Sequence, residues 1–148
     1  MTNLSEDEIE FLREHRSAAM ITVDAAGVAK AARVGVALVD GRLWSSGTAD
    51  RVRTRRLRRD PRCTLFVFDG TFLWLSVESR VTILDGPDAP DLNLRLFRVM
   101  QDRPTGPLTW FGSELDDDAF RTRMVDESRL IYEFEVVKSY GVVKAPSF

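Results

Sequence analysis

The chain has 148 residues, of which 44% are hydrophobic and 30% are charged, and its formal net charge is −2. These values are typical of a single globular domain over residues 1–148, and they exclude the strong overall basic charge of many nucleic-acid-binding proteins. Cys63 is the one cysteine, which excludes an internal disulfide and a zinc site of several thiolates and fits a cytoplasmic protein. We predict no metal site. The N-terminus is acidic and no apolar run approaches membrane-spanning length, so neither a secretory signal nor a membrane segment is expected.

Local signals mark the predicted helices and turns. Ser5 and Glu8 have the spacing of a capping box, which predicts that a helix begins here. Asp40-Gly41 between apolar runs is typical of a two-residue hairpin turn. Asp50 is a candidate N-cap for a second helix, which Pro61 prevents from continuing. In chain order we expect a helix to about residue 14, strands over 17–23, 28–39 and from 43, a helix over 50–59, strands over 63–68 and 73–84, helices over 88–102 and 116–127, and a strand over 130–137.

The predicted strands are joined mostly by tight turns, which favours antiparallel pairing. Six such strands with few helices between them can close into a small barrel, and closure removes exposed strand edges. A barrel of this size is filled by its own side chains. We therefore expect a mostly β fold, a six-stranded antiparallel β-barrel with flanking helices, whose ligand site lies on the outside or at a subunit boundary.

The arginine-rich segment at residues 51–62 is the most informative feature of the sequence. It follows small hydroxyl and glycine residues, Ser45-Ser46-Gly47-Thr48, at the end of a predicted strand. A helix start offers unpaired backbone N–H groups and a positive dipole end, and arginine binds phosphate or carboxylate through two N–H groups at once. The segment therefore predicts a site for a small anionic ligand. Its arginines are Arg51, Arg53, Arg55, Arg56, Arg58, Arg59 and Arg62.

Two features of the sequence have more than one interpretation. The arginine-rich helix could instead be a solvated face whose charges pair with acids such as Asp60, or a helix that binds nucleic acid. The acidic net charge and the lack of interleaved aromatic residues argue against nucleic acid. Trp110, in the predicted loop 108–112, either packs in the core or caps a ligand pocket.

Residues 51–61, with the sequence RVRTRRLRRDP, resemble the segment that follows the third strand in the split β-barrel flavin and deazaflavin oxidoreductases. This is the superfamily of the pyridoxamine 5′-phosphate oxidases, and the chain looks most like the branch that uses coenzyme F420. Asp40-Gly41 and Tyr140-Gly141 also match, and the resemblance covers nearly the whole chain. It implies a split barrel of the FMN-binding type and a homodimer with two cofactor sites between its subunits.

The resemblance also implies roles for individual residues. Those on the second strand match positions near the isoalloxazine-like ring, and those from Ser45 to Arg53 match the phosphate-binding segment. Arg55 and Arg56 would assist there or meet the oligoglutamate tail of F420. The cofactor-binding residues implied in this way are Arg33, Val34, Gly35, Ser45, Ser46, Arg51, Arg53, Arg55 and Arg56.

The chain departs from the family pattern at residues 33–35, where Ser or Asn with Pro is common. Arg53 and Arg56 stand where lysine and asparagine are frequent. The C-terminal segment also lacks the arginine-rich ending of the pyridoxamine 5′-phosphate oxidases proper, which argues against that particular reaction.

The function implied by the resemblance is an F420-dependent oxidoreductase, a reductase that transfers hydride from reduced F420 to an unsaturated or quinone-like small molecule. A deazaflavin carries the hydride itself, so no catalytic triad or metal cluster is needed and no catalytic residue is assigned. The alternatives are an FMN-dependent flavin oxidoreductase of the same fold and a non-catalytic protein that binds a cofactor or haem. The expected partners are a small-molecule substrate and a second copy of the chain, without nucleic acid or membrane.

Overall fold

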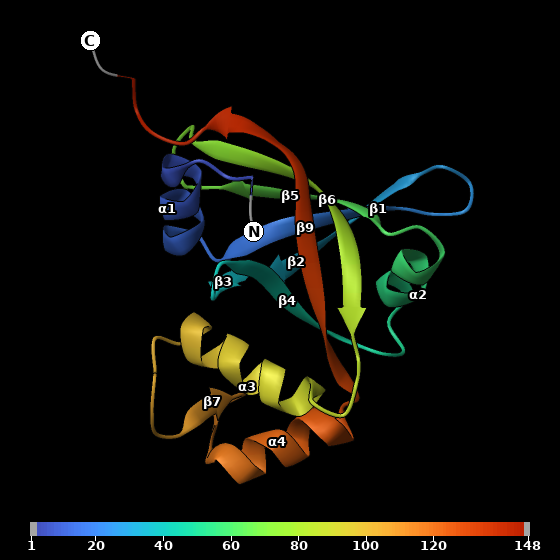
Figure 1. Ribbon diagram of the computed structural model, residues 1–148, viewed down its shortest axis with the longest axis vertical. Helices are drawn as coiled ribbons and strands as arrows, with labels where there is room; N and C mark the ends of the chain where they lie inside the picture. The colour runs from blue at the N-terminus through green and yellow to red at the C-terminus, as the bar shows by residue number, and fades with distance from the viewer. Residues whose placement is uncertain (1–2, 147–148) are drawn as a thin grey trace.

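Antiparallel strands in one curled sheet form the centre of the molecule (Figure 1). The computed structural model describes residues 3–146. The strands are β1 (Ser17–Val23), β2 (Ala29–Gly35), β3 (Ala37–Val39), β4 (Arg42–Thr48), β5 (Arg62–Phe68), β6 (Trp74–Leu84), β7 (Leu108–Trp110), β8 (Ser113–Leu115) and β9 (Arg129–Val142). The helices are α1 (Glu6–Glu14), α2 (Val52–Arg59), α3 (Ala89–Met100) and α4 (Asp117–Asp126). Within residues 3–146, no helix is both long and apolar enough to cross a membrane.

The sheet has the strand order β2-β1-β5-β6-β9-β4-β3, and it curls until its two edges meet. The edge strands β2 and β3 are separated in the sequence by Val36 alone. The Val36 N–H donates to the Arg16 carbonyl at 2.9 Å, and the Ser45 hydroxyl donates to the Gly35 carbonyl at 2.6 Å. The result is an antiparallel half-barrel with flanking helices, in agreement with the predicted split barrel.

The predicted number of six strands is wrong, because the sheet has seven. The predicted strand 28–39 divides at Val36. Its first part pairs with β1 and its second part pairs with β4. One continuous stretch of chain therefore forms both edge strands of the sheet. The Asp40-Gly41 turn is confirmed, and both residues have the positive φ values, 49° and 77°, that such a hairpin requires.

The inside of the curl holds the main hydrophobic core, to which α1 contributes Phe11 and Leu12. The predicted capping box of α1 is confirmed. The Glu8 N–H donates to the Ser5 hydroxyl at 3.2 Å, and the Ser5 N–H donates to the Glu8 carboxylate at 2.9 Å. These contacts satisfy two helix-end N–H groups and fix where α1 begins.

The last strand is longer than predicted. It continues to Val142 because β6 pairs with it over the whole of its own length, with one irregularity between Glu78 and Ser79. Beyond Val136 the residues of β9 are mostly exposed and no longer alternate between buried and exposed. The sequence there therefore lacks the alternating pattern that predicts a half-buried strand. Gly141 lies so close to the Trp74 backbone that an added Cβ would overlap the Trp74 carbonyl.

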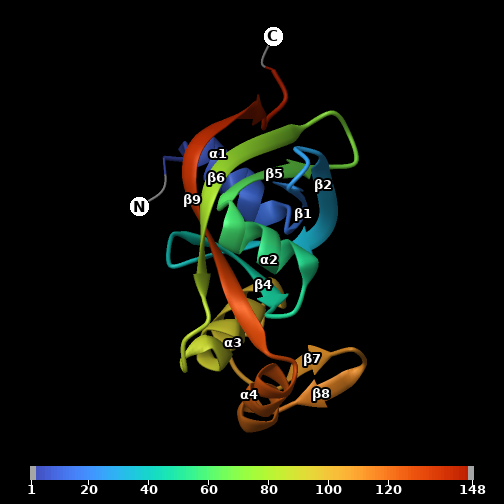
Figure 2. The same cartoon turned by 90° about the vertical axis from the view of Figure 1, so that its right-hand side faces the viewer.

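A second lobe, formed by α3, α4 and the β7–β8 hairpin, packs on the sheet at β3, β4 and β9 (Figure 2). The β7–β8 hairpin was not predicted. Trp110 lies on β7, is only 6% exposed and packs edge-on against Phe97 and Phe120, so it belongs to the core of this lobe.

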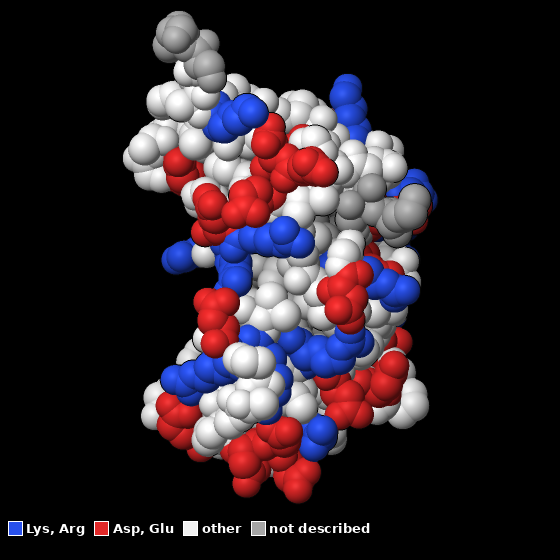
Figure 3. All heavy atoms as spheres, turned by 60° about the vertical axis from the view of Figure 1, so that its left-hand side comes forward, with Lys and Arg blue, Asp and Glu red and all other residues white. Residues whose placement is uncertain are grey.

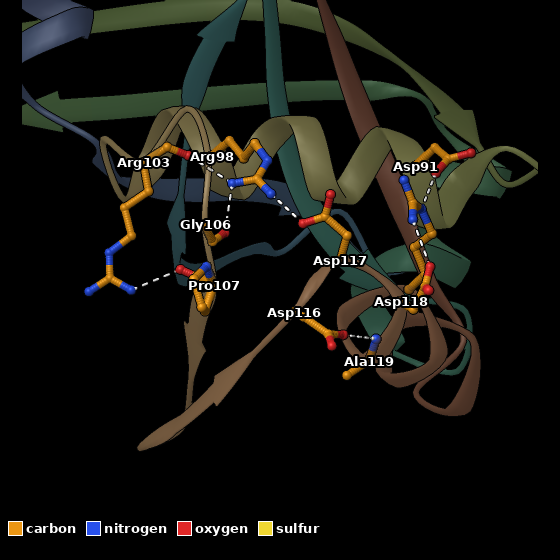
Figure 4. A network of polar contacts seen from close by, with 10 residues as sticks. Asp91, Arg98, Arg103, Gly106, Pro107, Asp116, Asp117, Asp118 and Ala119 are labelled. Carbon is orange, nitrogen blue, oxygen red and sulfur yellow. Dashed lines mark hydrogen bonds and ion pairs between the residues drawn. The ribbon is translucent and has the colours of Figure 1, made fainter.

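The acidic run at residues 116–118 is used for structure within this lobe (Figure 4). Each of its carboxylates has a partner on α3 or α4, and the pair of Asp117 with Arg98 joins the two helices. The contacts are Asp116 with the Ala119 N–H (2.8 Å), Asp117 with Arg98, and Asp118 with Arg121 (3.1 Å).

A buried polar contact holds α2 against the sheet. The Thr54 hydroxyl donates to the Thr48 carbonyl at 2.7 Å and forms a short hydrogen bond with the hydroxyl of Tyr132, a fully buried residue of β9. Gly47 makes room for this contact, because a Cβ added there would overlap the Tyr132 ring.

We predict that Gly47→Ala lowers the free energy of unfolding by about 1–3 kcal/mol, because the Tyr132 ring must shift to accept the methyl group. Urea denaturation followed by circular dichroism measures this change. Gly70→Ala is the matched control, because an added Cβ meets nothing within 4 Å there. Equal stability of the two variants would contradict the prediction.

Candidate functional site

The N-terminus of α2 lies where β4 ends, and it has no acidic neighbour in the helix. Its N-cap is Arg51, not the predicted Asp50, and no side chain accepts the first N–H groups of the helix. Asp50 instead accepts the Thr48 hydroxyl at 2.9 Å. The positive end of the helix dipole therefore coincides with a cluster of guanidinium groups, an arrangement that favours an anion.

A hollow of about 270 Å³ lies between α2 and the β1–β2 pair, beside the helix that faces the viewer in Figure 2. We call it the anion hollow. Four of its lining residues are basic, and Lys30 comes from β2 whereas the others come from α2 and its N-cap. Its lining residues are Met20, Thr22, Lys30, Ala31, Ala32, Arg51, Val52, Arg53 and Arg56.

The arginines of the anion hollow lack acidic partners. Within residues 3–146, no carboxylate oxygen lies within 4.0 Å of the guanidinium of Arg51, Arg53 or Arg56. Arg58, on the same helix, pairs with Asp85 at 2.9 Å. On the face seen in Figure 3, basic and acidic side chains lie next to one another. Among the described residues, the three arginines of the hollow therefore have no ion-pair partner, whereas Lys30 pairs with Asp24 at 3.8 Å.

Arg53 is the most unusual of these residues. Its Nε atom is buried and has no hydrogen-bond partner. Burial lowers the pKa of its guanidinium, Tyr132 partly opposes this shift, and the like charges of Arg51 and Arg129 lower the pKa further. A buried N–H group without an acceptor costs free energy, and an anion in the hollow that accepted its hydrogen bond would remove that cost.

A second hollow, of about 710 Å³, shares Arg51 and Val52 with the first. We call it the polar hollow. It lies between residues 48–52 and residues 126–129. The two hollows thus meet at the start of α2, which leaves room on both sides for a ligand longer than a phosphate group.

Arg129, in the wall of the polar hollow, is held by its neighbours. Its guanidinium pairs with Glu127 at 2.9 Å and lies 5.1 Å from the centre of the Trp110 ring. Trp110 donates its indole N–H to Glu127 at 2.9 Å. Partial burial raises the pKa of Glu127, but the hydrogen bonds from Trp110 and Arg129 outweigh it, so that pKa is below its ordinary value. Glu127 therefore remains a carboxylate that orients Arg129.

A third hollow, of about 530 Å³, adjoins the anion hollow along β2, and Ala31 and Ala32 line both. We call it the alanine hollow. Its other lining residues are Ser17, Ala18, Ala19, Arg33 and Phe68.

The structure brings together only some of the residues assigned by resemblance. Arg51, Arg53 and Arg56 meet at the anion hollow, whereas the guanidinium of Arg55 is exposed and donates to the Asp50 carbonyl at 2.8 Å. Arg33 lines the alanine hollow. The cofactor roles of all these residues remain predictions.

The two serines lie elsewhere. The buried Ser45 hydroxyl is used at the seam of the sheet, and Ser46 donates to Asn93 of α3 at 2.6 Å. Neither lines one of the three hollows. Val34 is in the main core, and a Cβ added at Gly35 would overlap Met100.

Lys30 and Arg129 were not identified from the sequence. Lys30 lies opposite Thr22 in the β1–β2 pair, and the turn at 24–27 was the signal that could have placed it there. Arg129 lies opposite Thr48 in the β4–β9 pair. That pairing joins distant parts of the chain, so no local pattern announces it.

Comparison with known proteins agrees with the fold. The family model described as pyridoxamine 5′-phosphate oxidase matches residues 4–139. No curated protein sequence matches the chain. Three similar solved structures share 22% sequence identity or less with the chain. At such low identity the similarity shows a common fold alone.

The conserved hypothetical protein Rv2991 from Mycobacterium tuberculosis has a TM-score of 0.73 and 22% identity, covering 95% of this chain and 86% of that one. A protein named F420 reductase has a TM-score of 0.67 and 20% identity, covering 93% and 98%. A NimC/NimA family protein from Clostridium acetobutylicum has a TM-score of 0.59 and 15% identity, covering 90% and 81%. Because the family match spans most of the sequence, the chain belongs to the pyridoxamine 5′-phosphate oxidase family, a family of flavin and deazaflavin oxidoreductase-like proteins.

Proposed function

We propose that this protein binds coenzyme F420 in the cytoplasm and reduces an unsaturated or quinone-like small molecule. The observation that carries the proposal is the buried, unpartnered Nε of Arg53 beside the uncompensated start of α2. A phosphate group fits this donor set, because guanidinium and helix N-terminal N–H groups are its usual partners in proteins. Each charge-assisted contact of this kind contributes about 1.5–3 kcal/mol.

In this proposal Arg51, Arg53 and Arg56 hold the phosphate in the anion hollow. When bound, reduced F420 supplies the hydride. The chain binds and orients the cofactor and excludes water from it, and it needs no proton donor within the anion hollow.

The extent of the positive charge favours F420 over FMN. FMN ends at its phosphate, whereas F420 continues into an anionic tail. Arg55 and Arg59 also have no carboxylate within 4.0 Å among the described residues, so they are available to an anionic tail. The similar structure named F420 reductase supports the same choice.

We further propose a homodimer with the sites between its subunits. Aromatic residues form an exposed apolar surface on the outer face of β5, β6 and β9. Phe66 packs on Trp74 with ring centres 5.8 Å apart, Phe68 is 60% exposed and Tyr140 is 43% exposed. Because Phe68 also lines the alanine hollow, a second subunit on this surface would border that hollow.

Replacement of Arg53 tests the cofactor assignment. We expect Arg53→Met to weaken F420 binding about tenfold or more, the loss of one charge-assisted contact. Titration followed by F420 fluorescence measures the dissociation constant, and a parallel titration with FMN identifies the preferred cofactor. Arg58→Met is the matched control, because Arg58 lies on the same helix but pairs with Asp85. Unchanged affinity in Arg53→Met, or tighter binding of FMN than of F420, would contradict the assignment.

The same variant should have the opposite effect on stability. The lowered pKa of Arg53 means that folding disfavours its charged form, and at neutral pH the residue is charged in both the folded and the unfolded state. We therefore expect Arg53→Met to raise the Tm of the cofactor-free protein. With saturating F420 the order reverses, because only the wild type gains the binding free energy. Thermal unfolding with and without F420 measures both, and a lower Tm for the cofactor-free variant would show that Arg53 stabilises the fold.

Oxidation of reduced F420 separates a reductase from a carrier. The assay mixes protein, reduced F420 and menadione, and follows the return of F420 absorbance. A protein that binds F420 without accelerating this oxidation, with menadione or with conjugated acids, would be a carrier.

A further inference from the structure

We propose that Arg33 selects the electron acceptor, and that this acceptor carries a carboxylate conjugated to the double bond that is reduced. The inference rests on the proposed function, because it places the acceptor beside an F420 whose phosphate lies in the anion hollow. It goes beyond that function by naming the substrate class and the residue that recognises it.

The alanine hollow is suited to a flat ligand. Its lining is mostly alanine: Ala19 and Ala31 share the outer face of β1 and β2 with Arg33 and leave space above the strands, and the aromatic ring of Phe68 forms one side. Small apolar side chains permit a planar molecule to lie close to the backbone, and they offer no hydrogen bonds to orient it. The orientation must then come from the remaining polar residues.

Those polar residues are Ser17 and Arg33. Arg33 is the single charged residue among the described residues that line the hollow. Its Nη2 donates to the Ser17 hydroxyl at 3.3 Å, and within residues 3–146 no carboxylate oxygen lies within 4.0 Å of it. A guanidinium with most of its donors free, beside an apolar floor, recognises a planar anion by a two-pronged hydrogen bond.

Arg33 and the arginines of α2 lie on opposite faces of the edge strand β2, and the two hollows adjoin across it. The anion hollow and the alanine hollow share Ala31 and Ala32, so the β2 strand forms a wall of both. A phosphate at Arg53 and an anionic acceptor at Arg33 can therefore occupy the two hollows at the same time. In the β1–β2 register, Lys30 pairs with Thr22 and Arg33 with Ala19, which keeps the two cations apart along the strand.

The position of Arg33 also suits the chemistry of such an acceptor. A hydride, with its electron pair, forms the new C–H bond at the β-carbon of the conjugated acid, and the former π pair moves toward the carboxyl oxygens. A proton from solvent then forms the C–H bond at the α-carbon, and the cofactor is left oxidised by two electrons. The negative charge that gathers on the carboxyl oxygens is stabilised by a guanidinium that is already in place.

A matched pair of probes tests the inference. Cinnamate and cinnamamide share one conjugated skeleton, and only cinnamate carries a charge. Isothermal titration calorimetry measures the affinity of each for the protein, both without cofactor and with saturating oxidised F420, so that no turnover interferes. We expect the wild type to bind cinnamate about tenfold or more tightly than cinnamamide, the effect of one charge-assisted pair.

In Arg33→Gln this preference should fall to less than about threefold, and in Arg33→Lys it should be partly retained. Arg80→Gln is the matched control, because Arg80 is also an exposed strand arginine, and it should keep the full preference. The F420 dissociation constant, measured by fluorescence, should change in Arg33→Gln by less than the carboxylate preference does.

Each outcome separates this inference from the proposed function. Equal binding of the two probes by the wild type, or a retained preference in Arg33→Gln, overturns the role of Arg33. A large loss of F420 affinity in Arg33→Gln with an unchanged preference also overturns it, and makes Arg33 a cofactor residue. A wild type that prefers cinnamate but does not bind F420 keeps the anion site at Arg33 and removes the F420 assignment alone.

Discussion

The contact between Tyr132 and Thr54 determines where the arginines of α2 lie. This helix has eight residues, and Leu57 is its one large apolar side chain that is fully buried. A helix so short and so charged has little stability in isolation and little apolar surface to bury. The buried hydrogen bonds of Thr54 to Tyr132 and to the Thr48 carbonyl therefore fix it to the sheet. The absence of a side chain at Gly47 is what lets the tyrosine ring reach this place.

The same arrangement explains why the protein tolerates an unfavourable charge. Tyr132 and Arg129 both come from β9, and both lie close enough to Arg53 to influence its pKa. Tyr132 favours the charged guanidinium and Arg129 disfavours it. A side chain that binds an anion must be partly desolvated before the anion arrives, and that desolvation weakens the fold. The half-buried Arg53 thus carries a cost in stability that Tyr132 offsets in part and that a bound anion would offset further.

Sequence reasoning succeeded where the deciding interactions are local. The capping box of Ser5 and Glu8, and the turn at Asp40-Gly41, each depend on residues at most three positions apart, and both are present. It failed where the deciding partner is distant. No local pattern can show that the strand 28–39 divides at Val36, because the division depends on whether β1 or β4 is the neighbour.

The same contrast between local and distant interactions holds for the candidate site. The arginine-rich helix was found from the sequence because its charges are consecutive. The environment of Ser45 and Ser46 was not, because two neighbouring hydroxyls on a strand point to opposite faces. One meets the Gly35 carbonyl at the seam and the other meets Asn93 of the second lobe. The hydroxyl residue that does support the helix is Thr54, which lies inside the arginine run and was not singled out.

The edge strand β2 connects the fold to the proposed chemistry. An unpaired strand edge invites pairing with other chains, and charged side chains on that edge discourage it. β2 carries Lys30 and Arg33, and it forms a wall of both the anion hollow and the alanine hollow. The charges that protect the edge are therefore also those that face the two hollows. Because β2 ends at the seam, where Gly35 fits beneath Met100 and accepts the Ser45 hydroxyl, its position relative to β4 and thus to the start of α2 is fixed. The closure of the sheet, more than any single loop, sets the spacing between the proposed phosphate site at α2 and the proposed acceptor site at Arg33.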